Sequence, residues 1–523
     1  MQAQETGRPK LVVGIMVDQM RYDYLYKYQS FYGKGGFKRL INEGSNFTYA
    51  HFNYVPTSTG PGHASVYTGT TPYYHGIINN NWYDRTSKKS IYCCGDTSYK
   101  TVGSTSQEGE MSPLNLLSTT ITDQVKLSSN GRSKVISIAL KDRGAILPGG
   151  RWANAAYWYD NKTGCFISST YYMDKLPDWV EKFNAMKLAD SFLSKGWHLL
   201  RNERDYAMSA PDQSAAEHDA FSEGKTSFPH FFDKMKNKYD GVEITPFGNE
   251  MVARLAMTAL TSEKLGKGKE TDFLAVSFSS TDFISHAFGS DSYENQDTYM
   301  RLDGQIEELL NTLDREVGKG NYLLFLSADH AAINTPALLK QHRLPAGELN
   351  QKRAADSLKA FVKRKYGNEK IIESISGNQI FLSRELTAES GLNIHEIMVS
   401  VKDFIRDNFT AVNWIFTRDE LDRQIAGREE RNFILNGYNP SRSGDIALNL
   451  QPGFLPNFLN EGTTHGSPYT YDTHVPMIYF GWHVPKQTVN TPVYIVDIAA
   501  TIANLLNITE TSAAMGIPLI KQQ

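Results

Sequence analysis

Acidic and imidazole side chains follow three short apolar runs, at the points where buried strands would end. They are Asp18 after residues 11–17, Asp282 and His286 after residues 273–278, and Asp329 and His330 after residues 322–326. The carboxyl ends of parallel strands meet at one edge of a sheet, where functional crevices lie. One aspartate at such a place is usually a turn or capping residue, but three strands that end in this way indicate a shared site. Aspartate and imidazole ligands together suit zinc, with manganese or iron as alternatives.

Two other segments carry residues that would complete such a site. His465 lies in a glycine-flanked loop, residues 463–466, before the apolar run 477–480. Its position alone is equally consistent with a metal ligand and with a histidine that has only a structural role. The hydroxyl-rich turn of residues 57–59 leads into a short helix, whose free N–H groups favour anions. Ordinary capping explains most such hydroxyls, and a threonine such as Thr59 becomes a nucleophile only beside a metal or a base.

Strand-like and helix-like patterns alternate over much of the chain. The apolar runs that predict buried strands are residues 11–17, 135–140, 273–278, 322–326 and 477–480. The segments that predict helices are residues 37–42, 116–127, 250–265, 299–317 and 497–506. This alternation predicts an α/β fold with a mostly parallel central sheet and helices on both faces.

The alternation is interrupted twice. Residues 148–248 are rich in aromatic and small polar residues, and residues 332–456 contain helices and strands of another character. Both stretches lie between core strands, so we predict two insertions that form a cap. The predicted core then consists of three parts, residues 8–147, 249–331 and 457–523.

The composition excludes several functional classes. The chain has 523 residues, 54 Lys and Arg against 57 Asp and Glu, and a net charge of −3, which gives no electrostatic case for nucleic acid or an anionic membrane surface. No apolar stretch approaches the roughly 18 residues that span a bilayer, so we expect no membrane insertion. Residues 1–5 lack the features of a signal peptide, as in a chain that begins after its cleavage. Three cysteines, two of them adjacent, form neither a disulfide framework nor a thiolate zinc site.

In order and spacing, these motifs resemble those of the alkaline phosphatase superfamily. The motifs are Asp18, Thr59, Asp282-x3-His286, Asp329-His330 and Thr464-His465-Gly466. Within the superfamily the chain is similar to the nucleotide pyrophosphatase/phosphodiesterase branch, and most similar to the bacterial PafA-like alkaline phosphatases with a threonine nucleophile. The similarity runs from residues 9–14 to residues 497–499.

The resemblance implies a role for each motif residue. One Zn²⁺ would be held by Asp282, His286 and His465, and a second by Asp18, Asp329 and His330. Thr59 would connect the second metal to the phosphorus atom. Asn80 would bind a phosphoryl oxygen, and Lys141 and Arg143 match the pair that marks monoesterases in this branch. One departure is Ala331, where relatives usually have glycine after the Asp-His pair.

The function implied is that of a zinc-dependent alkaline phosphomonoesterase, which hydrolyses small phosphate monoesters to alcohol and inorganic phosphate through a phosphothreonine intermediate. The alternative is a phosphodiesterase or nucleotide pyrophosphatase on the same bimetal scaffold. The positive charges of Lys141 and Arg143 favour the monoesterase, because a phosphate monoester carries nearly two negative charges and a diester only one. A third reading is a metal-stabilised binding protein without turnover. We expect a monomer that acts in the periplasm or after secretion.

Overall fold

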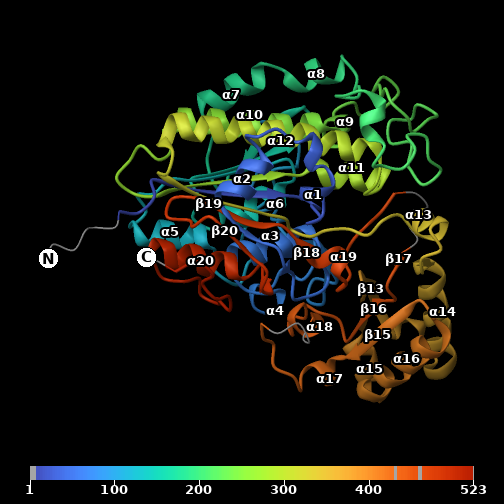
Figure 1. The fold of residues 1–523 in the computed structure, drawn as a ribbon. Coiled ribbons are helices and arrows are strands. Elements are labelled where there is room, and N and C mark those ends of the chain that lie inside the picture. The colour runs from blue at the N-terminus through green and yellow to red at the C-terminus, as the bar shows by residue number, and fades with distance from the viewer. Residues whose placement is uncertain (1–6, 429–432, 457–461, 522–523) are drawn as a thin grey trace.

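A ten-stranded sheet runs through the middle of the protein, with helices on both of its faces (Figure 1). The computed structural model describes residues 7–428, 433–456 and 462–521. The strands lie in the order β20 (Gln487–Val489), β2 (Ser45–Phe47), β19 (Met477–Gly481), β11 (Tyr322–Ser327), β1 (Leu11–Val17), β10 (Asp272–Phe278), β7 (Val135–Ala139), β8 (Ala155–Asp160), β9 (Cys165–Ser169) and β6 (Thr101–Val102). The expectation about residues 1–5, which lack the features of a signal peptide, lies outside the described residues.

The centre of this sheet is parallel and its margins are mixed. Strands β11, β1, β10, β7 and β8 run parallel to one another. Strand β19 is antiparallel to β11 on one side, and β9 is antiparallel to β8 on the other. In the central register Val17 lies opposite Phe278, and Met16 lies opposite Ser327. The predicted fold class is therefore confirmed, and the three strands that precede acidic residues end at the same edge.

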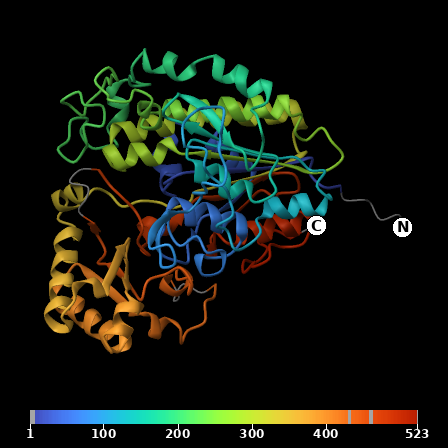
Figure 2. The ribbon, with the colours of Figure 1, turned by 180° about the vertical axis from the view of Figure 1, so that it is seen from behind.

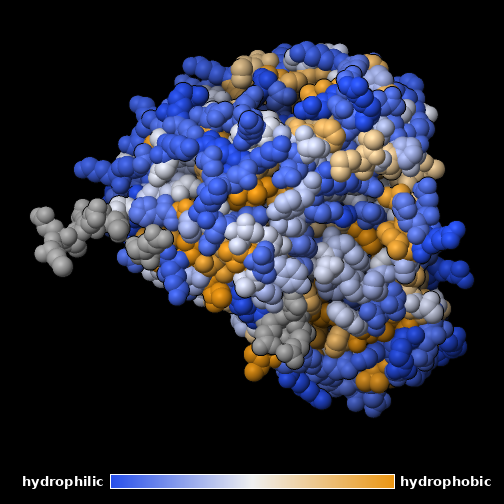
Figure 3. Space-filling model, in the orientation of Figure 1, coloured by the Kyte–Doolittle hydropathy of each residue, from blue (hydrophilic) through white to orange (hydrophobic). Residues whose placement is uncertain are grey.

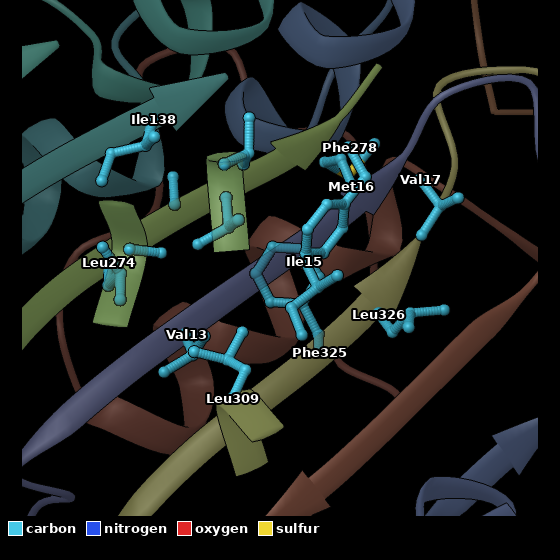
Figure 4. Close-up of a cluster of buried hydrophobic side chains, with 14 of the residues drawn as sticks. Val13, Ile15, Met16, Val17, Ile138, Leu274, Phe278, Leu309, Phe325 and Leu326 are labelled. Atoms are coloured by element: carbon cyan, nitrogen blue, oxygen red, sulfur yellow. The ribbon is translucent and has the colours of Figure 1, made fainter. Parts of the chain in front are cut away.

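The central strands are buried on both faces, which explains their continuous apolar sequences. All seven residues of β1 are buried. Figure 4 shows side chains of β1, β10, β11 and α12 gathered in this core, among them Val13, Leu274, Phe325 and Leu309. Gly14 lies in the middle of β1 because a methyl group there would collide with the ring of Phe325.

Two layers of helices cover the sheet, as the views from front and back show (Figures 1 and 2). One layer contains α2 (Phe37–Glu43), α10 (Pro246–Ser262) and α12 (Tyr293–Leu313). The other contains α3 (Thr59–Thr68), α5 (Ile121–Ser128), α6 (Asp142–Gly149) and α20 (Asp497–Leu506). The helix predicted at residues 497–506 is confirmed in both of its bounds.

Three predicted helices begin elsewhere because of their caps. Helix α5 begins at Ile121 rather than at residue 116, since the Thr120 side chain accepts a hydrogen bond from the Asp123 backbone and the Asp123 carboxylate accepts one in return. Helices α10 and α12 begin before residues 250 and 299. Pro246 occupies the first turn of α10, and the Ser292 side chain caps α12.

The two stretches that interrupt the core differ in kind. Residues 148–248 contribute β8 and β9 to the central sheet, and then form α7 (Asp178–Ala185), α8 (Leu188–Leu193) and α9 (Asp240–Glu243), which pack against α10. This stretch is thus in part an extension of the sheet. Residues 332–456 form a separate four-stranded sheet, in the order β13 (Ile372–Ser376), β14 (Gln379–Leu382), β16 (Ile446–Leu450) and β15 (Val412–Thr417).

Helices α14 (Gln351–Tyr366) and α16 (Ile394–Asn408) pack on this second sheet and close a hydrophobic core of its own. We call residues 332–456 the cap; it lies at the lower right of Figure 1. The face seen in Figure 3 is largely hydrophilic, with small, separate apolar areas. Among the described residues, no helix is both long enough and apolar enough to cross a bilayer.

Candidate active site

The predicted ligand residues meet at the carboxyl edge of the parallel strands. Asp18 follows β1, and Asp329 and His330 follow β11. Asp282 and His286 lie one turn apart on α11 (Ser280–Phe288), which begins directly after β10. The loop that precedes α19 (Thr470–Thr473) and β19 brings His465 to the same place. Asp18, Asp329 and His330 have no exposed surface.

The first group of ligand atoms belongs to Asp282, His286 and His465, which lie within 4.8 Å of one another. Asp282 Oδ1 is 3.1 Å from His286 Nε2 and 3.7 Å from His465 Nε2. The other ring nitrogen of each histidine faces a backbone carbonyl, that of Thr463 at 2.7 Å and that of Thr57 at 2.6 Å. A proton on Nδ1 leaves Nε2 free to bind a metal, so the surroundings select the ligating tautomer.

The second group contains Asp18, Asp282 and His330, again within 4.8 Å. The resemblance implied Asp18, Asp329 and His330 for this group, whereas the structure groups Asp282 with Asp18 and His330. Asp329 is nevertheless close, because its Oδ2 lies 3.6 Å from His330 Nε2, which is 3.5 Å from Asp18 Oδ1. All three of these atoms are buried and have no hydrogen-bond partner in the described structure. Buried polar atoms that converge without partners form an arrangement that suits a cation.

The electrostatics of the site also favour a cation. Burial raises the pKa of Asp18, and the charges of Asp282 and Asp329 raise it further. Burial also acts on Asp282, but the charges of His286 and Lys141 outweigh it and hold the pKa of Asp282 well below its usual range. Three carboxyl groups thus lie within one buried space. A bound cation would offset the repulsion between their negative charges.

Burial acts in the opposite sense on the imidazole of His465. It lowers the pKa of His465 well below its usual range, and the nearby charges of His330 and His286 add to the effect. The rings of His330 and His465 are stacked with their centroids 3.5 Å apart. Burial likewise lowers the pKa of His330, and a lowered pKa favours the neutral form in which histidine binds metals.

Lys141 lies directly at the ligand carboxylates. Its Nζ is 2.7 Å from Asp18 Oδ2 and also contacts Asp282 Oδ2. Burial opposes the charge of Lys141, but Asp18 and Asp282 outweigh it and raise the pKa of the amine. This raised pKa favours the charged form of Lys141 within the acidic cluster.

Arg143 lies in the first turn of α6, beside Lys141. One guanidinium N–H donates to Tyr92 Oη at 3.2 Å, and this hydroxyl donates to Asp142 Oδ1 at 2.6 Å. Arg143 Nε is buried without a partner among the described residues. A cavity of about 160 Å³ adjoins these side chains and is lined in part by Glu243, whose pKa burial raises to about 7.

Thr59 is the first residue of α3, and its side chain is 1% exposed. Asn80 Oδ1 accepts a hydrogen bond at 2.7 Å from the backbone N–H of Gly60, so the asparagine lies beside the end of the helix that carries Thr59. The neighbouring Asn79 instead binds the Ser58 hydroxyl. The side-chain NH₂ of Asn80 makes no hydrogen bond to the described residues.

The structure adds residues that sequence reasoning missed. His63 Nδ1 is 2.9 Å from the Thr59 carbonyl and 3.4 Å from Asp329 Oδ2, and thus connects the end of α3 to the ligand carboxylates. Its spacing of four residues from Thr59, one helical turn, is the signal that would have found it. Ala331 is buried, and its carbonyl faces His330 Nδ1 at 3.1 Å, so the methyl group in place of the usual glycine is accommodated.

Comparisons with known proteins found a matching family and relatives that cover nearly the whole chain. The family profile "Type I phosphodiesterase / nucleotide pyrophosphatase" matches residues 12–468. Alkaline phosphatase PhoV of Synechococcus elongatus is 44% identical over 515 residues, which cover 98% of this chain and 92% of the relative. Alkaline phosphatase PafA of Elizabethkingia meningoseptica is 39% identical over 528 residues, covering 99% and 95%. The crystal structure of wild-type PafA superposes with a TM-score of 0.94 at 40% identity, over 98% of each chain.

Proposed function

The chain belongs to the type I phosphodiesterase / nucleotide pyrophosphatase family and is a phosphomonoesterase of the alkaline phosphatase kind, and we propose that it acts through two zinc ions and a threonine nucleophile. The activity follows from alkaline phosphatases of high identity that match nearly the whole chain. The observation that carries the metal proposal is the convergence of Asp18 Oδ1, Asp329 Oδ2 and His330 Nε2, all buried and unpartnered in the described structure.

The donor set fits zinc. Carboxylate oxygens and neutral imidazole nitrogens are its common ligands, and the histidines expose Nε2 toward the aspartates. Asp282, His286 and His465 would hold one ion, and Asp18, Asp329 and His330 the other, with Asp282 close to both. Once bound, a pair of zinc ions would lower the pKa of the nucleophile and of water, and would neutralise charge on the phosphoryl group.

The chain's own residues would then perform a two-step transfer. The Thr59 hydroxyl gives up its proton to solvent, and its oxygen attacks phosphorus while the bond from phosphorus to the alcohol oxygen breaks. The departing oxygen takes a proton from solvent, which gives phosphothreonine and the alcohol. Water attacks this phosphothreonine in the second step, which restores Thr59 and releases inorganic phosphate. Because Thr59 begins α3, the helix N-terminus favours the anionic oxygen and the phosphate.

Three side chains would bind the phosphoryl oxygens during both steps. The free NH₂ of Asn80 offers a hydrogen bond, and Arg143 offers a planar fork that suits two oxygens at once. Lys141 adds a fixed positive charge between Asp18 and Asp282. A phosphoryl transition state requires this kind of positioning and charge neutralisation rather than further covalent chemistry.

The alternative of a diesterase or pyrophosphatase on the same scaffold is separated by one experiment. Hydrolysis of an aryl phosphate and of its methyl diester is compared by kcat/KM. The monoester is expected to react much faster, because Lys141 and Arg143 match the two charges that only the monoester carries. A faster diester would reject the proposed substrate class.

The metal proposal has its own test. Elemental analysis of the purified protein is expected to find about two zinc ions per chain, and loss of the metal should abolish turnover. The family resemblance further supports a monomer that acts in the periplasm or outside the cell.

A further inference from the structure

Gln19 lies between the two groups of ligand atoms, in the turn that follows β1. Its side-chain Nε2 donates to Asp282 Oδ1 at 2.7 Å. Its backbone N–H donates to Asp329 Oδ1 at 3.1 Å. The residue is 2% exposed, so solvent does not compete for either bond. Gln19 thus contacts Asp282, which belongs to the first group, and Asp329, which the resemblance assigned to the second group.

The oxygen that Gln19 binds is the one that faces the histidines. Asp282 Oδ1 is the atom 3.1 Å from His286 Nε2 and 3.7 Å from His465 Nε2. The amide must present its NH₂ here, because the opposite orientation would bring two acceptor oxygens to 2.7 Å. The same Gln19 Nε2 is 3.4 Å from His286 Nε2, so the amide lies among the ligand atoms themselves. A donor that holds a ligand carboxylate fixes the direction of that ligand.

The turn holds Gln19 in a conformation that disfavours folding. Its φ is +61°, in the left-handed region that side chains other than glycine, asparagine and aspartate rarely adopt. Its Oε1 is buried without a hydrogen-bond partner in the part of the chain described. Both features destabilise the native state, and strain of this kind is retained where the surrounding structure has a use for it.

We propose that Gln19 is a positioning residue, whose two hydrogen bonds fix Asp282 and Asp329 relative to one another and thereby set the affinity for metal. The inference rests on the proposed function, since the ligand roles of the aspartates are themselves proposed. Gln19 does not touch the substrate in this assignment. It acts through the two carboxylates and through His286, whose Nε2 lies 3.4 Å from the Gln19 side-chain nitrogen.

The test separates positioning from support of the fold by using variants with opposite effects on stability. Gln19→Gly removes the amide and the strained conformation but keeps the backbone N–H that binds Asp329. Gln19→Met removes the amide and keeps the strain. Lys187→Gly is the matched control, because Lys187 is exposed, has a φ of +49° and directly precedes α8, one of the helices that pack against α10.

Two quantities are measured on each protein after removal of metal: the melting temperature, and the zinc affinity by competition with a chelator. Gln19→Gly is expected to melt no lower than the wild type, yet to bind at least one of its zinc ions about 10- to 100-fold more weakly. Gln19→Met should lose affinity by a similar factor. Lys187→Gly should bind zinc like the wild type.

Each contrary result has a distinct meaning. Wild-type affinity in both Gln19 variants would overturn the positioning role. A lower melting temperature of metal-free Gln19→Gly, together with lower affinity, would show that Gln19 supports the fold instead. Failure of the wild type to bind zinc would reject the proposed function itself, which separates that failure from the failure of this inference.

Discussion

Replacement of Arg143 by alanine tests the assignment of substrate class. The two cationic side chains at the site, Lys141 and Arg143, differ in the partners that they already bind. Lys141 is engaged by Asp18 and Asp282, whereas the Arg143 guanidinium, with five N–H groups, donates to the Tyr92 hydroxyl. Arg143 therefore retains several donors for a substrate, and its loss should be felt mainly by the bound phosphoryl group.

The size of the effect follows from the number of bonds. A fork that reaches two phosphoryl oxygens makes two charge-assisted hydrogen bonds, each worth about 1.5–3 kcal/mol. A net loss of about 3 kcal/mol lowers kcat/KM for a monoester by roughly 100-fold. A diester carries half of the charge, so the same variant should lose only about 10-fold.

The assay compares kcat/KM for 4-nitrophenyl phosphate and for methyl 4-nitrophenyl phosphate. Arg143→Lys should fall between the wild type and Arg143→Ala, because it keeps the charge and loses the fork. Arg353→Ala, on the exposed part of cap helix α14, is the matched control and should change neither rate. Equal losses for monoester and diester in Arg143→Ala would refute the reasoning.

Four other outcomes are expected. Thr59→Ala should abolish turnover while Thr59→Ser retains part of it, and acid-quenched wild type should carry phosphate on Thr59 by mass spectrometry; full activity of Thr59→Ala would exclude the nucleophile. Chelation should abolish activity and lower the melting temperature, and added zinc should restore both; unchanged activity in the metal-free protein would exclude the metal mechanism. Tyr92→Phe should lower kcat/KM for monoesters several-fold, because Arg143 loses its hydroxyl partner, and a change in melting temperature alone would count against this role. Burial lowers the pKa of His75 to about 3, so the stability that its neutral form contributes is complete above pH 6.5 and is lost as the pH falls toward 3. Between pH 6.5 and 5, the free energy of unfolding of the metal-free wild type should fall by about 2 kcal/mol more than that of His75→Gln in denaturant titrations. Equal decreases in the two proteins would contradict this prediction.

The central part of the fold was predictable because its strands are buried on both faces. The continuous apolar run of β1 and the polar Asp18 after it mark the strand to the residue. Strand β8 was missed, since its sequence is rich in aromatic residues like the irregular stretch around it, although every residue of it is buried. The N-terminal ends of α5, α10 and α12 depend on single capping residues, which periodicity alone does not weigh.

Part of the candidate site was predictable because Asp18, Asp282 and the pair 329–330 come after central strands, whose ends the topology brings together. Their pairing was less predictable. Asp282 lies near both ligand groups, and this depends on side-chain directions that no spacing specifies. Gln19 carries no sequence signal besides its position after Asp18, because its contacts lie with Asp282 and Asp329, far away in the chain. Tyr92 likewise reaches Arg143 only through the fold.

The ligands of the first group come from distant parts of the sequence, with His465 lying beyond the whole cap. On the ribosome, a nascent polypeptide would already expose Asp282 and His286 long before His465 is made. Metal captured at that stage would meet an incomplete cage and dissociate readily. On the proposed assignment, the cage for this ion would be complete only after synthesis of the cap and docking of the loop that carries His465, so metallation would be one of the last events in the maturation of this enzyme.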